Sequence, residues 1–343
     1  MRRLVSIQHL RGLAALSVVV FHAFQSMFIK LETGAYGVDL FFIISGFVMW
    51  VTTADRTVSP GAFLKRRVVR VAPLYWLVTT FALITVLIWP GWIANVIPDP
   101  AHVLMSYAFI PHLDPKGGPF PLLNLGWTLN YEMFFYLVFA AVLTVEQRWR
   151  PVILTLVMLG VFWFGFNVWT AAYYVGANAH MLQFAAGVWL GVAWRAKVLP
   201  PRWLGLLMIF AGFALLARLQ AHDYTPGLMR PLELGAPALL IAAGWLGAEA
   251  DPKGGIPKLS WMQRLGDASY AIYLCHTFSA PLVLRVVGFE RPWLFIPLTV
   301  VTGVGTGLAC HSLVERPVTG WLRRRLDAGP PLVVERSDIE RAV

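Results

Sequence analysis

The sequence predicts an all-α, polytopic integral membrane protein: a helical bundle of about ten transmembrane helices with both termini in the cytoplasm. Composition is the first indication, because 58% of the 343 residues are hydrophobic, only 13% are charged and the mean hydropathy is +0.64. Soluble domains are about 25% charged. The second indication is a series of continuous apolar runs, which must be helices in hydrocarbon because their backbone has to bond internally. The third is the distribution of Lys and Arg.

Each apolar run is long enough to cross a hydrocarbon core about 30 Å thick. Polar segments, many of them containing Pro or Gly, separate one run from the next. The predicted spans are residues 10–30, 36–53, 73–92, 124–145, 151–169, 179–196, 202–219, 231–248, 267–287 and 293–314.

Lys and Arg set the orientation of the spans, because cytoplasmic loops carry an excess of both. With the N-terminus inside, the inner loops and tails carry 22 of these residues and the outer loops carry 6. Membrane topology therefore explains the formal charge of +10, and we expect the lipid bilayer and no nucleic acid as a partner.

Cys275 and Cys310 both fall inside apolar spans, which indicates neither a disulfide framework nor a cysteine metal site. Residues 1–3 resemble the start of a signal peptide, but Arg11 and His22 interrupt the apolar run and no clear cleavage site follows. We therefore expect an uncleaved first span and no bound metal.

One transmembrane domain is predicted over residues 1–326, followed by a polar, disordered cytoplasmic tail over 327–343. The longest outer connection, 93–123, is rich in Pro and Gly but has an apolar middle at 103–110. We expect a short helix at the outer interface there. Both a lid or binding surface and a structural plug fit a loop of this length.

Arg11 and His22 are the ionisable residues of the first apolar run. Ten residues lie between them, which places them about 16 Å apart along a helix axis. If Arg11 marks the inner edge of the bilayer, His22 lies near its middle. An ionisable side chain at that depth is expensive and indicates a functional site. The alternative is a neutral histidine that bonds a neighbouring helix and adjusts packing.

Arg66, Arg67 and Arg70 precede the third span on its inner side. Positive-inside anchoring explains any one of them. Three arginines within five residues also make a good phosphate-binding cluster, because the guanidinium group matches phosphate geometry with two parallel hydrogen bonds. The two interpretations are compatible.

Asp39 and Glu132 are carboxylates near the outer ends of the second and fourth spans. With His22 they come from three different spans, and all three should lie in the mid-to-outer half of the membrane. An imidazole with nearby carboxylates is a general-base arrangement. Spacing gives depth and not rotation, so contact among them is not established, and Asp39 alone could simply favour a helix N-terminus.

The stretch 266–276 opens the ninth span and places His276 near mid-membrane. We interpret this histidine as structural. The triplet at 315–317, Glu-Arg-Pro, is predicted to close the tenth span at the inner face.

With these residues the chain resembles the membrane acyltransferase 3 family, which includes O-acetyltransferases of surface polysaccharides and ExoZ-type exopolysaccharide-production acyltransferases. The resemblance covers nearly the whole chain, and six motifs in family order are strong where one would be weak. The motifs are Arg11 ten residues before His22, GVDLFFIISGF at 37–47, RRVVRVAPLY at 66–75, WTLNYEMFFY at 127–136, LGDASYAIYLCH at 265–276, and Glu315-Arg316-Pro317.

The resemblance implies transfer of an acyl group, usually acetyl, from cytoplasmic acetyl-CoA or another acyl-CoA to a carbohydrate hydroxyl outside the bacterial inner membrane. It also implies that Arg11 and His22 are an essential pair. We expect Arg11 to bind the phosphates of CoA together with Arg66, Arg67 and Arg70. Exopolysaccharide and other cell-surface glycans are the expected acceptors.

His22 is then the candidate general base on the acceptor hydroxyl, or a transient carrier of the acyl group. Glu132 or Asp39 would orient or charge it. Any tetrahedral intermediate needs an oxyanion donor. The unranked candidates for substrate binding and for that donor are Trp127, Tyr136 and Ser45.

Two other functions fit the sequence. A proton-coupled transporter or exporter of a glycan precursor would also use intramembrane His, Asp and Glu, although we find no inverted repeat or paired broken helices. An assembly factor for a polysaccharide synthase is the third, and the intact His22 and Glu132 count against it. Contact with polysaccharide biosynthesis machinery is compatible with the enzyme. The acceptor, the acyl chain and the oligomeric state are left open.

Overall fold

Two helices of this chain begin at a side-chain cap. Ser59 precedes α3 (Pro60–Ile88) and its hydroxyl accepts a hydrogen bond from the Ala62 amide. Asp99 precedes α4 (Pro100–Tyr107), and its carboxylate accepts one from the His102 amide. In both helices Pro is the first residue, where its missing N–H costs nothing.

The computed structural model describes residues 4–90, 96–167, 180–221, 231–250 and 255–327. These ranges fold into helices and contain no strand, which confirms the all-α class. The predicted tail at 327–343 lies outside them, apart from Asp327 at the end of α14. The remaining helices are α1 (Val5–Gln25), α2 (Tyr36–Thr53), α5 (Trp127–Val142), α6 (Arg150–Asn167), α8 (His180–Arg195), α9 (Arg202–Gln220), α10 (Ala236–Ala250), α11 (Ser260–Cys275), α12 (Ser279–Val287), α13 (Pro292–Cys310) and α14 (Arg316–Asp327).

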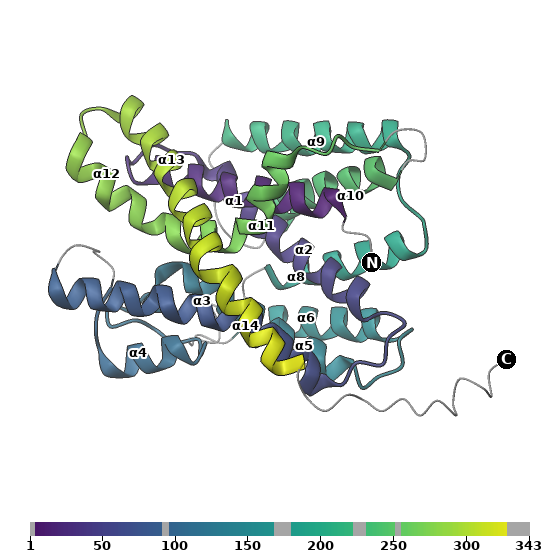
Figure 1. The fold of residues 1–343 in the computed structure, drawn as a ribbon. Helices are drawn as coiled ribbons and strands as arrows, with labels where there is room; N and C mark the ends of the chain where they lie inside the picture. The colour runs from purple at the N-terminus through teal and green to yellow at the C-terminus, as the bar shows by residue number, and fades with distance from the viewer. Residues whose placement is uncertain (1–3, 91–95, 168–179, 222–230, 251–254, 328–343) are drawn as a thin grey trace.

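Eight helical segments in the described ranges are long and apolar enough to cross a membrane, which supports a polytopic membrane protein. The other two predicted spans correspond to α6, whose apolar part is shorter, and to α8 with 16 residues. The count of about ten spans therefore stays a prediction. The start of α1 and the end of α14 lie away from the side that carries the α12–α13 turn and the far end of α3 (Figure 1).

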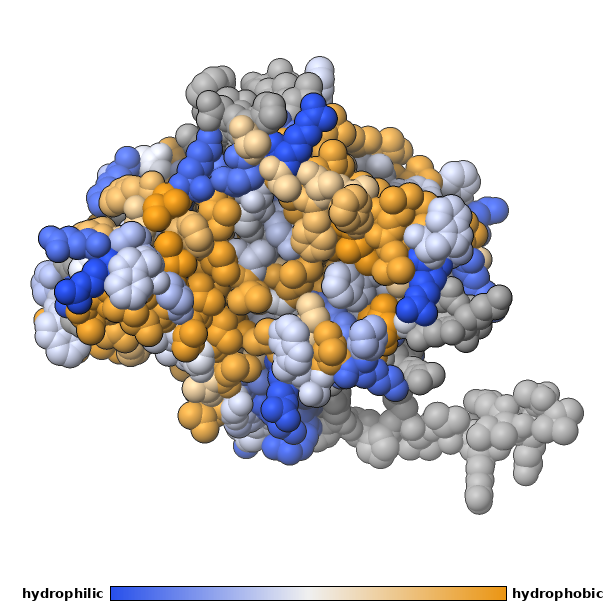
Figure 2. Space-filling view, turned by 90° about the horizontal axis from the view of Figure 1, so that it is seen from above, coloured by the Kyte–Doolittle hydropathy of each residue, from blue (hydrophilic) through white to orange (hydrophobic). Residues whose placement is uncertain are grey.

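Large apolar side chains point outward from several helices. Along α9 they include Trp203, Leu207 and Phe210, which are 68%, 53% and 71% exposed. Figure 2 shows apolar side chains covering much of one face, with hydrophilic groups gathered toward its edges. Such a surface is stable against lipid and unfavourable against water.

Small residues bring the inner helices into backbone contact. A Cβ added to Gly46 of α2 would collide with the Phe184 carbonyl of α8, and one added to Gly187 of α8 would collide with the Ile43 carbonyl of α2. Gly12 of α1 meets α11 in the same way. These contacts fix α1, α2, α8 and α11 against one another.

Two helix boundaries differ from the sequence prediction. The predicted span 267–287 begins earlier, at Ser260, and a 3₁₀ turn at His276–Phe278 divides it into α11 and α12. The triplet at 315–317 does not end the helix, because a π turn at His311–Glu315 leads directly into α14. Pro317 is tolerated because it is the second residue after that turn, near a helix start.

The outer connection contains the short helix that was expected near 103–110, although α4 lies slightly earlier. Tyr75 of α3 donates a hydrogen bond to the Ser106 carbonyl, and the Ser106 hydroxyl accepts one from the Leu122 amide. These bonds hold the connection against the outer end of α3.

Candidate functional site

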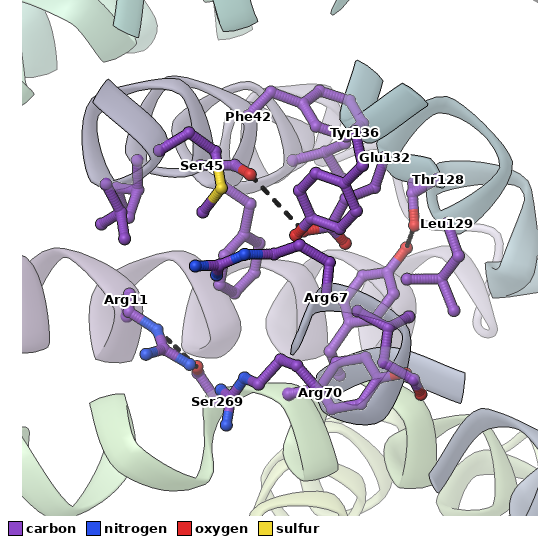
Figure 3. A pocket seen from close by; sticks show the side chains of 18 residues that line it. Arg11, Phe42, Ser45, Arg67, Arg70, Thr128, Leu129, Glu132, Tyr136 and Ser269 are labelled. Carbon is purple, nitrogen blue, oxygen red and sulfur yellow. Dashed lines mark hydrogen bonds between the residues drawn. The ribbon is translucent and has the colours of Figure 1, made fainter. Parts of the chain in front are cut away.

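Three arginines from two helices converge on one cavity (Figure 3). Arg11 comes from α1, and Arg67 and Arg70 come from successive turns of α3. Their guanidinium groups gather on one side of the cavity, across from Thr128 and Leu129 of α5. The cavity has a volume of about 150 Å³. Three like charges around so small a space favour an anionic ligand.

Arg11 and Arg70 are held by neighbours. Arg11 donates to the Ser269 hydroxyl of α11 from Nε and Nη2, at 3.2 Å and 2.9 Å. Arg70 forms an ion pair of 3.3 Å with Glu315, which is 2% exposed. Glu315 also contacts His311 at 2.7 Å. The motif at 315–317 thus positions an arginine of the cavity instead of closing a helix.

Arg67 and Arg66 diverge although they are adjacent. The Arg67 guanidinium lies 5.4 Å from the Phe63 ring centroid and lines the cavity, and its buried Nε has no hydrogen-bond partner among the described residues. Arg66 is exposed and does not line the cavity. Only two of the three clustered arginines therefore belong to this site.

Glu132 lies opposite the arginines on α5 (Figure 3). Its Oε1 accepts hydrogen bonds from the Tyr136 hydroxyl and, at 3.5 Å, from the Ser45 hydroxyl of α2. Each hydroxyl has a single proton, so both protons are used on the carboxylate. Tyr136 and Ser45 therefore lie in the predicted site, where they bind Glu132.

His22 lies outside this cavity, further along α1. Its Nδ1 is 2.9 Å from the Val18 carbonyl and 3.2 Å from Nε2 of His276. Among the described residues, neither Glu132 nor Asp39 hydrogen-bonds the His22 ring. Arg11 and His22 thus occupy two positions on one helix, about 16 Å apart.

Asp39 and Trp127 belong to a second buried cluster around α8. Asp39 accepts a hydrogen bond from Gln183 at 3.1 Å and lies 3.8 Å from Nε2 of His180. The Trp127 ring packs on His180 and Tyr131, with centroid distances of 5.3 Å and 5.4 Å. Trp127 does not line the arginine cavity.

The α11 residues are the part of the site that sequence reasoning missed. Ser269, Tyr270 and Tyr273 line the arginine cavity, and His276 contacts His22. The signal was present, since Ser269, Tyr273 and His276 are spaced four and three residues apart and so share one helix face. His180 and Gln183 were also missed, and their spacing along the chain gives no indication that they approach Asp39.

Comparisons with known proteins agree with this architecture. The acyltransferase domain model of the acyltransferase 3 family matches residues 4–311. The "Exopolysaccharide production protein ExoZ" of Rhizobium meliloti (strain 1021) is 36% identical over 324 residues, which cover 91% of this chain and 98% of that protein.

Two more distant relatives match most of the chain. The "Peptidoglycan O-acetyltransferase OatA" of Listeria monocytogenes is 26% identical over 91% of this chain and 55% of its own length. The "Acyltransferase MdmB" of Streptomyces mycarofaciens is 26% identical over 94% of this chain and 93% of its own length. No solved structure matches the chain. The chain therefore belongs to the acyltransferase 3 family and is a multi-pass membrane O-acyltransferase.

Proposed function

We propose that the protein moves an acyl group, in the simplest case acetyl, from a cytoplasmic acyl-CoA to a hydroxyl of a carbohydrate outside the inner membrane of a bacterium. The observation that carries the donor is the buried Nε of Arg67, which has no partner in the described chain and lies beside Arg11 and Arg70. A buried guanidinium donor without an acceptor is costly, and a phosphate oxygen would satisfy it.

The size of the cavity limits which part of the donor it can hold. Ligand pockets for whole drug-sized molecules have volumes of about 300–1,000 Å³, whereas this cavity has about 150 Å³. It fits a phosphate group and the start of the pantetheine arm. The arm would then extend along α1 toward His22, about 16 Å further on.

His22 is suited to the proton transfer. As the acceptor oxygen attacks the thioester carbonyl, its proton passes to the imidazole. Collapse of the tetrahedral intermediate forms the ester and breaks the carbon–sulfur bond. The proton then returns from the imidazolium to the departing CoA thiolate. Transfer through an acyl-histidine is the alternative order of the same steps.

An exopolysaccharide is the acceptor that the relatives favour. The exopolysaccharide production protein of Rhizobium meliloti matches over nearly its entire length, whereas the peptidoglycan enzyme matches over 55% of its own. We propose a surface polysaccharide or its lipid-linked precursor as the acceptor, and polysaccharide biosynthesis machinery as the setting.

The test uses purified protein and radiolabelled acetyl-CoA. Wild type should release free CoA and form labelled product when supplied with membrane glycans, and Arg67→Gln should raise the KM for acetyl-CoA. Arg66→Gln is the matched control, since Arg66 is exposed and lies off the cavity. Folded protein that binds CoA but turns over no acyl-CoA would refute the proposal. Movement of glycan across vesicles without chemical change would favour the transporter instead.

A further inference from the structure

His22 and His276 form a ring pair that joins α1 to the end of α11. Their ring centroids are 5.0 Å apart, and Nε2 of His276 lies 3.2 Å from Nδ1 of His22. The two residues are 254 positions apart in the chain. The contact therefore exists only because α1 and α11 pack closely, with Gly12 of α1 and Gly266 of α11 in backbone contact with the opposite helix.

Backbone carbonyls determine which nitrogens carry protons in this pair. His22 Nδ1 lies 2.9 Å from the Val18 carbonyl, and His276 Nδ1 lies 3.1 Å from the Ile272 carbonyl. A carbonyl can only accept, so both rings are protonated at Nδ1. In a neutral His276 the Nε2 then carries a lone pair, so the single Nδ1–H of His22 is shared between the Val18 carbonyl at 2.9 Å and this lone pair at 3.2 Å.

The arrangement leaves one nitrogen of the pair for chemistry. His22 Nε2 has no proton in the neutral ring, and no described residue hydrogen-bonds it. His276 is 3% exposed, whereas His22 is partly exposed. The buried ring therefore supports the accessible one.

The packing around His276 is specific to this position. Gly303 of α13 lies against it, and a Cβ there would come within 3.1 Å of the His276 Cβ and 3.2 Å of the Ser279 hydroxyl. The 3₁₀ turn at His276–Phe278 begins at the histidine itself. At His276 a membrane-crossing helix is thus interrupted by the 3₁₀ turn, and the neighbouring helix α13 has a glycine, Gly303, opposite the imidazole.

We propose that His276 is a positioning residue for His22. Its Nε2 shares the His22 Nδ1–H with the Val18 carbonyl, which keeps His22 Nε2 as the basic nitrogen and stabilises the imidazolium that forms when that nitrogen takes the proton of the acceptor hydroxyl. No carboxylate is needed for this role, which agrees with the absence of a bond from Glu132 or Asp39 to the ring in the described chain. The inference rests on the proposed function for its kinetic consequence and on geometry alone for the tautomer.

The kinetic test compares His276→Leu with His276→Gln. Leu removes the acceptor, whereas the Gln side-chain oxygen can reach the place of Nε2. We expect Leu to lower kcat about 10- to 100-fold with little change in the KM for acetyl-CoA, by analogy with other groups that orient a reacting histidine, and Gln to restore most of the loss. His112→Leu is the matched control, because it removes an imidazole that accepts the same kind of bond outside the bundle.

A spectroscopic test does not depend on turnover. In wild-type protein labelled with ¹⁵N-histidine, His22 and His276 should each show a protonated Nδ1 and an unprotonated Nε2, and His276→Leu should shift the His22 Nδ1 signal. A His22 ring protonated at Nε2, or an unchanged kcat in folded His276→Leu, would overturn the inference. If wild type transfers no acyl group, the proposed function fails, and the spectrum still decides the hydrogen bond.

Discussion

Two histidine pairs in this protein share one hydrogen-bond pattern and differ in their surroundings. In each pair, Nδ1 of one ring faces Nε2 of the other, at 3.2 Å for His22 with His276 and 2.6 Å for His102 with His112. In each, the accepting ring uses its own Nδ1 on a backbone carbonyl, of Ile272 in the first pair and of Ile110 in the second.

The pairs differ in what surrounds the donating ring. His102 belongs to the short α4, is 3% exposed and bonds a residue only ten positions away. His22 is partly exposed and lies on the helix that also carries Arg11 of the arginine cavity. The two donating rings therefore share one pattern and differ in exposure, and in our proposal the more exposed His22 is the base.

The largest expected effect separates the two pairs directly. His22→Ala should lower acyl transfer by about 10²- to 10⁴-fold, because a general base is lost, whereas His102→Ala should stay near the wild-type rate. Turnover of radiolabelled acetyl-CoA by the purified variants measures both. Equal losses would show that the histidine on α1 has no special role.

The next effect tests whether Arg67 binds the acyl donor that His22 of the bundle pair, His22 with His276, would act on. Arg67→Gln should raise the KM for acetyl-CoA about 10- to 100-fold, since a buried hydrogen bond to a charged group contributes about 1.5–3 kcal/mol. Arg66→Gln should change it little. Initial rates over a range of acetyl-CoA concentrations provide the comparison, and identical KM values would remove Arg67 from the donor site.

A smaller effect should follow from moving the bundle pair without removing it. Gly303→Ala places a methyl group 3.1 Å from the His276 Cβ, so the ring must shift by a few tenths of an ångström. We expect kcat to fall roughly tenfold, because a misplacement of about 1 Å can cost about 10²-fold and this shift is a fraction of it. Gly305→Ala on the same helix meets nothing within 4 Å and should be neutral. Similar rates for the two variants would show that catalysis does not depend on the position of the His276 ring.

The smallest effect concerns the outer pair and pH. Burial lowers the pKa of His102 below its usual 6.5, and the charge of a nearby His112 lowers it further. In the unfolded segment His102 therefore binds a proton near pH 6.5, whereas in the folded segment it stays neutral to a lower pH. The folded segment is fully stable above that pH and loses stability as the pH falls. Hydrogen exchange of residues 96–122 should quicken between about pH 8 and about pH 5, beyond the intrinsic change in rate. His102→Gln should remove the excess, and its persistence would point to another group.

The sequence predicts position along a helix axis and not rotation about it, and Glu132, which was expected in the mid-to-outer half of the membrane, lines the cavity of Arg11, Arg67 and Arg70. Arg66 and Arg67 differ in depth by about 1.5 Å, yet one helix step turns them about 100° apart. One lines the cavity and the other faces outward. The apolar run could not show this difference, because both arginines precede it in the charged start of α3.

Partners from distant helices were equally hidden. Asp39 was one of two carboxylates that could orient His22, but it accepts a hydrogen bond from Gln183, which is 144 positions away. His276 was interpreted as structural from the sequence. The packing of α1 on α11 brings it to His22, and glycine contacts set that packing.

The reciprocal glycines of α2 and α8 have a consequence for how this protein can vary. At Gly46 and Gly187 the neighbour is a backbone carbonyl of the opposite helix and not a side chain. A larger residue at either position has no side chain opposite it that could shrink in compensation. A compensating substitution on the opposite helix is therefore not possible at either glycine. The packing of α2, which carries Ser45 and Asp39, is restricted in sequence, whereas lipid-facing positions can accept many apolar residues.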